Sequence, residues 1–89
     1  LIISPSAPAV NEEYKLTAQL DQANVYAERI SVLIAATDGL VFGRCEKTNI
    51  CTVALQSPKA YETKLIATFT DMKYPESFLR SAPVALIIK

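Results

Sequence analysis

Alternation of apolar and polar residues is the dominant pattern of this chain, and a period of two is typical of half-buried β-strands. Over residues 14–20 every second residue, from Tyr14 to Leu20, is apolar, and the residues between them are polar. Similar strand-like runs are predicted over residues 1–4, 29–37, 40–45, 51–55, 61–70 and 82–88. The pattern therefore indicates about seven short strands joined by turns.

The segments between the predicted strands are rich in turn-forming residues. Asp38 and Gly39 stand between two strand-like runs and predict a tight hairpin, because both residues tolerate a positive φ. Residues 21–29 and 71–80 are predicted as loops and residues 57–60 as a turn. Short strands separated by turns are typical of an antiparallel β-sandwich, so we expect a single all-β domain over residues 1–89. A small closed barrel is the structural alternative.

The charges are balanced and scattered along the chain, with nine Lys and Arg residues against nine Asp and Glu residues. No basic stripe is available to neutralise phosphates, so nucleic acid is not expected as a partner. The longest apolar runs, residues 32–36 and 84–88, are far shorter than the ~20 residues of a membrane-spanning helix, so membrane insertion is not expected either. The chain begins at Leu1 without a signal-peptide pattern. We therefore expect a processed chain or a module of a larger protein, with any export signal upstream.

The two cysteines, Cys45 and Cys51, could form a disulfide bond with each other, or both could be free buried thiols. The flanking residues favour the disulfide, because residues 40–45 and 51–55 are both strand-like and residues 46–50 would form a hairpin loop between them. Opposite positions of a hairpin bring two Cα atoms to about 5.5 Å, which suits a disulfide. A disulfide in turn indicates an oxidising compartment.

Several kinds of chemistry are excluded by the residues that the chain lacks. Without any His, the sequence cannot supply Ser-His-Asp or Cys-His catalysis, and two thiolates alone cannot fill a four-ligand structural zinc site. Acidic residues fall mostly in predicted turns, where Asp21, Asp38 and Asp71 are the candidates for loop-bound calcium, but no clustered Asp-x-Asp pattern supports such a site. We therefore expect no enzyme activity, catalytic residue, metal or cofactor.

Several motifs, in their order along the chain, resemble the immunoglobulin-like or fibronectin type III-like modules of exported bacterial proteins. They are a Pro-containing first strand, the alternating residues 14–20, the hairpin at 30–39, the cysteine pair, the corner Leu55, Pro58 and Tyr61, the run 67–71, and the final residues 83–86. The chain departs from antibody domains because its third strand has no Trp and its cysteines are close together in sequence.

This resemblance implies an immunoglobulin-like β-sandwich of about seven strands without chemistry of its own. Such modules serve as spacers or protein-contact domains of secreted or cell-surface proteins. The expected location is therefore extracellular or at the cell surface, and the expected partners are neighbouring domains of the same chain or another protein.

One face of the expected sandwich is unusually apolar. In an immunoglobulin-like sandwich the third, sixth and seventh strands share a sheet. The residues of these strands predicted to point into the core are Val32, Ile34, Leu65, Ala67, Val84 and Leu86. The residues left on the opposite face are then Leu33, Ala35, Ile66, Ala85 and Ile87. A contiguous apolar patch usually marks an interface. The alternative is a strand phase misjudged by one residue, or a loop that covers the face.

Three aromatic residues fall in predicted loops, namely Tyr26, Tyr74 and Phe78. Aromatic rings in loops can stack on sugars or anchor a partner, and they can also simply cover the edge of the core. A carbohydrate-binding module that uses these aromatics is therefore the alternative function.

Overall fold

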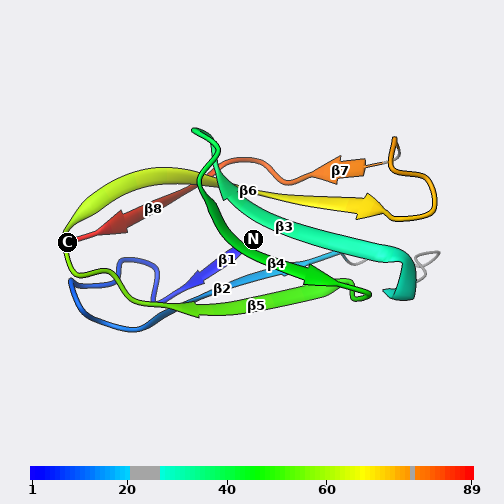
Figure 1. The fold of residues 1–89 in the computed structure, drawn as a ribbon. Helices are drawn as coiled ribbons and strands as arrows, with labels where there is room; N and C mark the ends of the chain where they lie inside the picture. Colours follow the sequence, from blue (N-terminus) through cyan, green and yellow to red (C-terminus); the bar gives the residue numbers. More distant parts are fainter. Residues whose placement is uncertain (21–26, 77) are drawn as a thin grey trace.

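Two antiparallel β-sheets pack against each other in the computed structural model, which describes residues 1–20, 27–76 and 78–89 (Figure 1). The strands are β1 (Ile2–Ser4), β2 (Tyr14–Gln19), β3 (Ile30–Ala36), β4 (Val41–Glu46), β5 (Ile50–Leu55), β6 (Tyr61–Asp71), β7 (Phe78–Arg80) and β8 (Val84–Ile88). One turn of 3₁₀ helix, η1 (Ala27–Arg29), precedes β3. The expected all-β sandwich is thus confirmed. Among the described residues, no helix is long and apolar enough to cross a membrane.

The two sheets differ in size. The smaller sheet has the order β1-β2-β5, and the larger has the order β4-β3-β6 with both β7 and β8 along the remaining edge of β6. β7 pairs with Thr68–Thr70, and β8 pairs with Tyr61–Leu65, so the two short strands follow one another along the same neighbour. The third predicted strand and the last two therefore share one sheet, as expected.

The core lies between the sheets and is built from the alternate residues of each strand. The side chains with no exposed surface include Leu16, Val32, Ile34, Leu65, Ala67 and Leu86. Burying a Leu, Ile or Val side chain in this way stabilises the fold by about 1.5–3 kcal/mol each. The inward-facing residues predicted for the third, sixth and last strands are thus buried, except that Val84 is only partly buried.

The segment 71–80, predicted entirely as a loop, contains the additional strand β7. Three residues are too few for a period of two to be recognised in the sequence. Between β7 and β8, Ser81 takes the place of a strand residue. Its hydroxyl oxygen accepts a hydrogen bond from the amide of Ala67 (2.9 Å), and its own amide donates to the Ala67 carbonyl (2.9 Å). The described residues therefore form eight strands, against the seven predicted.

The predicted hairpin between residues 40–45 and 51–55 is wrong, because the two strands belong to different sheets. β4 pairs with β3, whereas β5 pairs with β2. The chain crosses between the sheets at two consecutive residues. The amide of Thr48 donates to the carbonyl of Ile30 in the larger sheet (3.2 Å), and the carbonyl of Asn49 accepts from the amide of Leu20 beside the smaller one (2.8 Å). These contacts are distant in sequence, so no local pattern indicated them.

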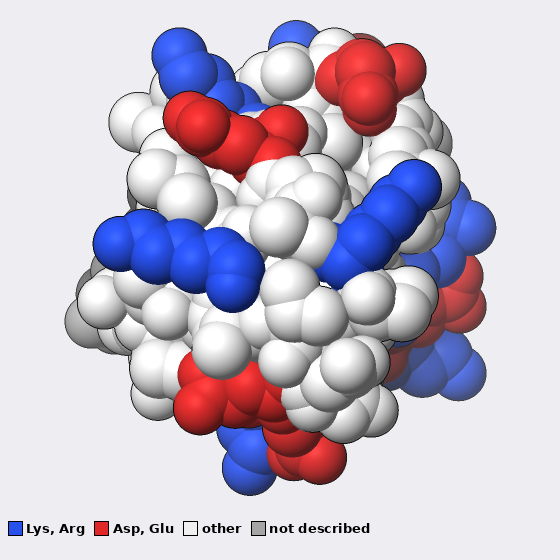
Figure 2. All heavy atoms as spheres, turned by 90° about the vertical axis from the view of Figure 1, so that its left-hand side faces the viewer, with Lys and Arg blue, Asp and Glu red and all other residues white. Residues whose placement is uncertain are grey.

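The charged side chains do not form a patch of one sign on the end of the molecule at which the C-terminus lies. There, Lys and Arg side chains alternate with Asp and Glu around uncharged surface (Figure 2). Interspersed charges of both signs create no strong local field.

Candidate functional site

The outer face of the five-stranded sheet is the strongest candidate for a functional surface. Leu33 and Ala35 of β3 alternate with buried residues and so point away from the core. Ile66 of β6 is the Cα partner of Ala35, which brings these three apolar side chains together in the middle of the face. All three are half-buried.

The other two predicted residues extend this group toward one edge. Ala85 and Ile87 lie on β8, and both are exposed. Their partners on β6 are Lys64 and Glu62, so two charged side chains stand beside them. These five side chains therefore point away from the core, as the alternation in the sequence predicted. Together they form a patch with an apolar centre and an extension that has charged neighbours.

Val41 also belongs to this surface, although the sequence did not single it out. It is the Cα partner of Ala35 on the other side of β3, and its side chain is 57 % exposed. The register between β3 and β4 shifts at Ile34 and Ala35, which changes the phase of β4 within its own length. Alternation in the sequence cannot locate such a shift, because a bulge inserts one residue on one strand only.

A depression of about 240 Å³ lies on this face beside the β3–β4 hairpin. It is lined by Ala35, Ala36, Thr37, Gly39, Ile66, Thr68 and Arg80. The small side chain of Ala35 and the side-chain-free Gly39 leave this space open.

The charged residues of the face surround the apolar centre. Arg44 is the Cα partner of Leu33, and Arg80 is the Cα partner of Thr68. The guanidinium carbon of Arg80 lies 4.9 Å from the centre of the Phe78 ring. An apolar centre with charges at its rim is the usual arrangement of a protein–protein interface.

Two of the three candidate aromatics, Tyr74 and Phe78, lie within the described residues. Tyr26 lies outside the described residues. Tyr74, which follows β6, is 48 % exposed, and Phe78, on β7, is 49 % exposed. The Tyr74 ring has the guanidinium of Arg29 at 5.4 Å and the ammonium of Lys73 at 5.6 Å from its centre. Tyr74 is thus involved in cation–π contacts with residues of its own chain.

Two of the three acidic residues that were candidates for calcium have structural partners in their own chain. Asp71 forms an ion pair with Arg29 (2.5 Å) and accepts a hydrogen bond from the amide of Lys73 (2.9 Å). The hydrogen bond from Arg29 is the main reason why the pKa of Asp71 lies below its usual range. Asp38 accepts from the amide of Leu40 and so closes the β3–β4 hairpin (3.0 Å). Asp21 lies outside the described residues, and the described residues contain no group of three or more potential metal ligands.

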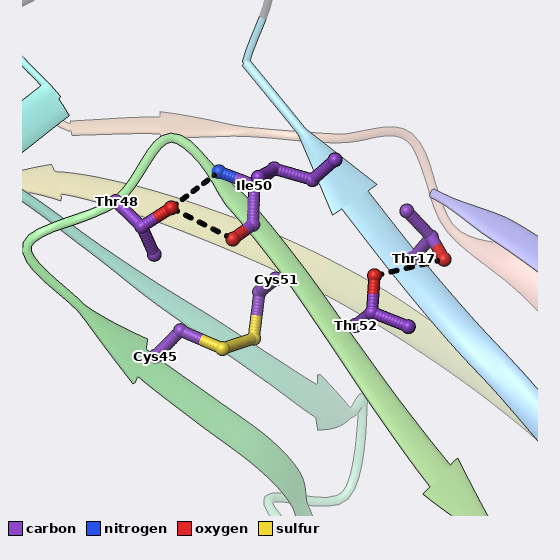
Figure 3. The surroundings of a disulfide bond; sticks show 6 residues. All are labelled: Thr17, Cys45, Thr48, Ile50, Cys51 and Thr52. Carbon is purple, nitrogen blue, oxygen red and sulfur yellow. Dashed lines mark hydrogen bonds between the residues drawn. A yellow bond between two sulfur atoms is a disulfide. The ribbon is translucent and has the colours of Figure 1, made fainter.

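The disulfide Cys45–Cys51 joins the two sheets rather than two strands of a hairpin (Figure 3). Its Cα atoms are 5.6 Å apart, Cys51 is fully buried, and Cys45 is half-buried. Beside it, the hydroxyl of Thr48 donates to the Ile50 carbonyl (2.9 Å) and accepts from the Ile50 amide (3.2 Å). The bond thus fixes one edge of the sandwich immediately next to the point where the chain changes sheets.

Comparison with protein-family models, curated proteins and solved structures finds no match for this chain in any of the three. Any inference about its function therefore rests on the surfaces of the protein itself. The outer face of the five-stranded sheet combines an apolar centre, a depression and a charged rim, all on rigid strands. These features suit a contact with another protein surface.

Proposed function

We propose that this protein is a non-catalytic module that makes protein contacts through the outer face of its five-stranded sheet. The observation that carries the proposal is the apolar centre of that face, formed by Leu33, Ala35, Ile66 and Val41 on three adjacent strands. A sheet face that meets only water is normally polar. An apolar patch on strands therefore indicates that another surface covers it.

The immunoglobulin-like or fibronectin type III-like assignment is part of this proposal. Its support is the arrangement of the strands into the groups β1-β2-β5 and β4-β3-β6-β8, with β3, β6 and β8 in one sheet. Modules of that kind stand in series as spacers or contact domains. A neighbouring domain of the same chain, or another protein, is then the partner of the face.

The proposed location is extracellular or at the cell surface, and the disulfide Cys45–Cys51 supports it. Disulfides persist in oxidising compartments and are rare where thiols are kept reduced. In a chain of 89 residues the core is small, so the roughly 2 kcal/mol expected from closing this short loop is a substantial part of the total stability.

A carbohydrate-binding module remains the alternative proposal. Tyr74 and Phe78 are about half exposed, which stacking on a sugar ring requires, but each ring already has a cation of its own chain nearby. The observations therefore favour a protein contact over a sugar.

A site-specific cross-linking experiment in the native setting tests the proposal. A photoreactive amino acid is placed at Val41 on the apolar face or, as the matched control, at Ile50 on the outer face of the other sheet. These two positions are both apolar, both on strands, and 57 % and 45 % exposed. We expect a discrete protein adduct from position 41 and none from position 50. Equal adducts from both positions, or none from position 41, would contradict the proposal.

A further inference from the structure

A second depression lies between the edge strands of the two sheets and borders the apolar face described above at Val41. It has a volume of about 220 Å³. Its lining comprises Tyr14, Leu40, Val41, Phe42, Leu55, Gln56, Ser57, Pro58 and Tyr61. These residues come from the beginnings of β4 and β6, from the start of β2, and from the end of β5 with the turn that follows it. The depression is thus a lateral opening into the end of the sandwich.

The shape of this opening follows from where the two edge strands are held together. β4 and β5 converge at the disulfide Cys45–Cys51 and diverge toward the other end of the molecule (Figure 1). Next to the disulfide, Gly43 meets Val53 so closely that an added Cβ would lie 2.6 Å from Val53 Cγ1. The glycine therefore allows the two edges to touch there. Beyond this point the strands separate, and the space between Val41 and Leu55 opens.

The inner wall of the opening carries two phenol groups. Tyr14 is almost fully buried, and Tyr61 belongs to the same wall. Burial first, and then this neighbour, raise the pKa of Tyr14, so the Tyr14 hydroxyl stays neutral at physiological pH. A phenol hydroxyl can donate one hydrogen bond and accept others. A ligand hydroxyl can form hydrogen bonds of this kind with the wall.

The turn that forms the outer wall is held in place by its own hydrogen bonds. The buried hydroxyl of Ser57 donates to the carbonyl of Lys59 (2.7 Å), and the carbonyl of Ser57 accepts from the amide of Asn11 (2.7 Å). The side-chain amide of Gln56 donates to the carbonyl of Asn11. The wall is therefore formed without a ligand, as is usual for small-molecule sites.

We propose that this opening binds a single uncharged aromatic ring that carries a hydroxyl group, that is, a ligand of the phenol class. Its volume is below the roughly 300–1,000 Å³ of sites for drug-sized ligands but above the ~150 Å³ cavity that holds benzene. No charged residue is among its described lining residues, so a charged ligand would have no counter-ion there. The rings of Tyr14, Phe42 and Tyr61 offer aromatic contacts.

The rim of the opening explains where the binding free energy would come from. Leu40 is 61 % exposed, and its neighbour Val41 is exposed to a similar extent. A ring seated between them and Pro58 removes apolar surface from water on both partners, which is favourable in proportion to the area removed. For a ligand of eight non-hydrogen atoms this predicts affinity of about millimolar strength.

Titration of the isotope-labelled protein with p-cresol, followed by amide NMR shifts, tests the proposal. We expect saturable shifts at about 10 mM ligand, confined to residues 40–42, 55–58 and 61. The non-aromatic analogue 4-methylcyclohexanol should bind at least about threefold more weakly, since it lacks the ring faces. A phenol ring could come from a tyrosine side chain of a peptide or from a free small molecule, and N-acetyltyrosinamide distinguishes these two sources. Binding of this compound assigns the site to a peptide side chain, and binding of p-cresol alone assigns it to a free small molecule.

Two variants and one control decide whether the shifts report this opening. Leu40→Trp places a large ring at the rim and should weaken p-cresol binding, whereas Ile2→Trp, at a residue 68 % exposed on β1, should leave it unchanged. Tyr61→Phe keeps the ring but removes the hydroxyl, so it should weaken p-cresol by about threefold to tenfold. The proposal is overturned by equal binding to all three variants, by shifts located elsewhere, or by methyl glucoside binding in preference to p-cresol. Failure here leaves the proposed contact face unaffected, because that face is tested by a protein adduct and this opening by the binding of p-cresol.

Discussion

The outer faces of the two sheets differ in where their apolar residues lie, although both sheets follow the same alternation. The three-stranded sheet turns mainly polar side chains outward, and Thr17 and Thr52 form a hydrogen bond across its strands (3.3 Å). Its exposed apolar residues, Ile2 and Ile50, lie on opposite edge strands with β2 between them. The five-stranded sheet instead gathers Leu33, Ile66 and their neighbours in its middle. Alternation therefore decides which side faces the core, and the nature of the outward residues distinguishes a solvated face from a contact face.

The largest effect is expected from truncating a residue on the inner side of β6. Its effect on the free energy of unfolding is compared with that of the outward residue beside it. Leu65 has no exposed surface, so Leu65→Ala should lower the free energy of unfolding by about 2–5 kcal/mol through lost burial and a cavity. Urea denaturation measures this change. A loss below about 1 kcal/mol would mean that the inner and outer sides have been exchanged.

The disulfide gives the next largest effect, because it holds the two sheets together at one edge. The double variant Cys45→Ala with Cys51→Ala should lower the unfolding free energy by about 2 kcal/mol, since the unfolded chain is no longer constrained. Denaturation of the oxidised and the reduced wild-type protein provides the control. If reduction of the wild type costs much less than the double substitution, the loss in the variant comes from the buried Cys51 side chain and not from the bond.

The smallest effect on stability is expected on the apolar face itself. Leu33→Thr together with Ile66→Thr keeps β-branched or strand-compatible residues at two half-buried positions, so the unfolding free energy should fall by about 1 kcal/mol or less. Contact with the partner, measured as the adduct from position 41 or as self-association in sedimentation, should be abolished. A loss of several kcal/mol would show that these residues belong to the core.

Much of the fold was predictable because it depends on local pattern. The strands with five or more residues were located from alternation to within a residue or two at each end. The turn at Asp38 and Gly39 was predicted from its residue types, and the structure confirms it with the hydrogen bond from Leu40 to Asp38. The predicted core of the third and sixth strands, including Val32 and Leu65, has no exposed surface.

The errors all concern choices that depend on distant partners. A cysteine pair between two strand-like runs fits a hairpin and a bridge between sheets equally well. The hydrogen bonds that decide between them, from Thr48 to Ile30 and from Leu20 to Asn49, join residues far apart in the chain. β7 was not predicted for the same reason. Its three residues form a strand because they pair with β6, and this pairing cannot be read from the three residues alone.

The sequence by itself determined the composition of both faces of each strand, because a period of two places alternate side chains on opposite sides wherever a strand forms. It thereby determined the apolar set that includes Leu33, Ala35 and Ile66. Only the tertiary structure decided that Val41 joins this set, that the disulfide crosses between sheets, and that an opening remains between Val41 and Leu55. These features depend on which strands become neighbours and on how closely their edges approach, and both are set by packing across the whole chain.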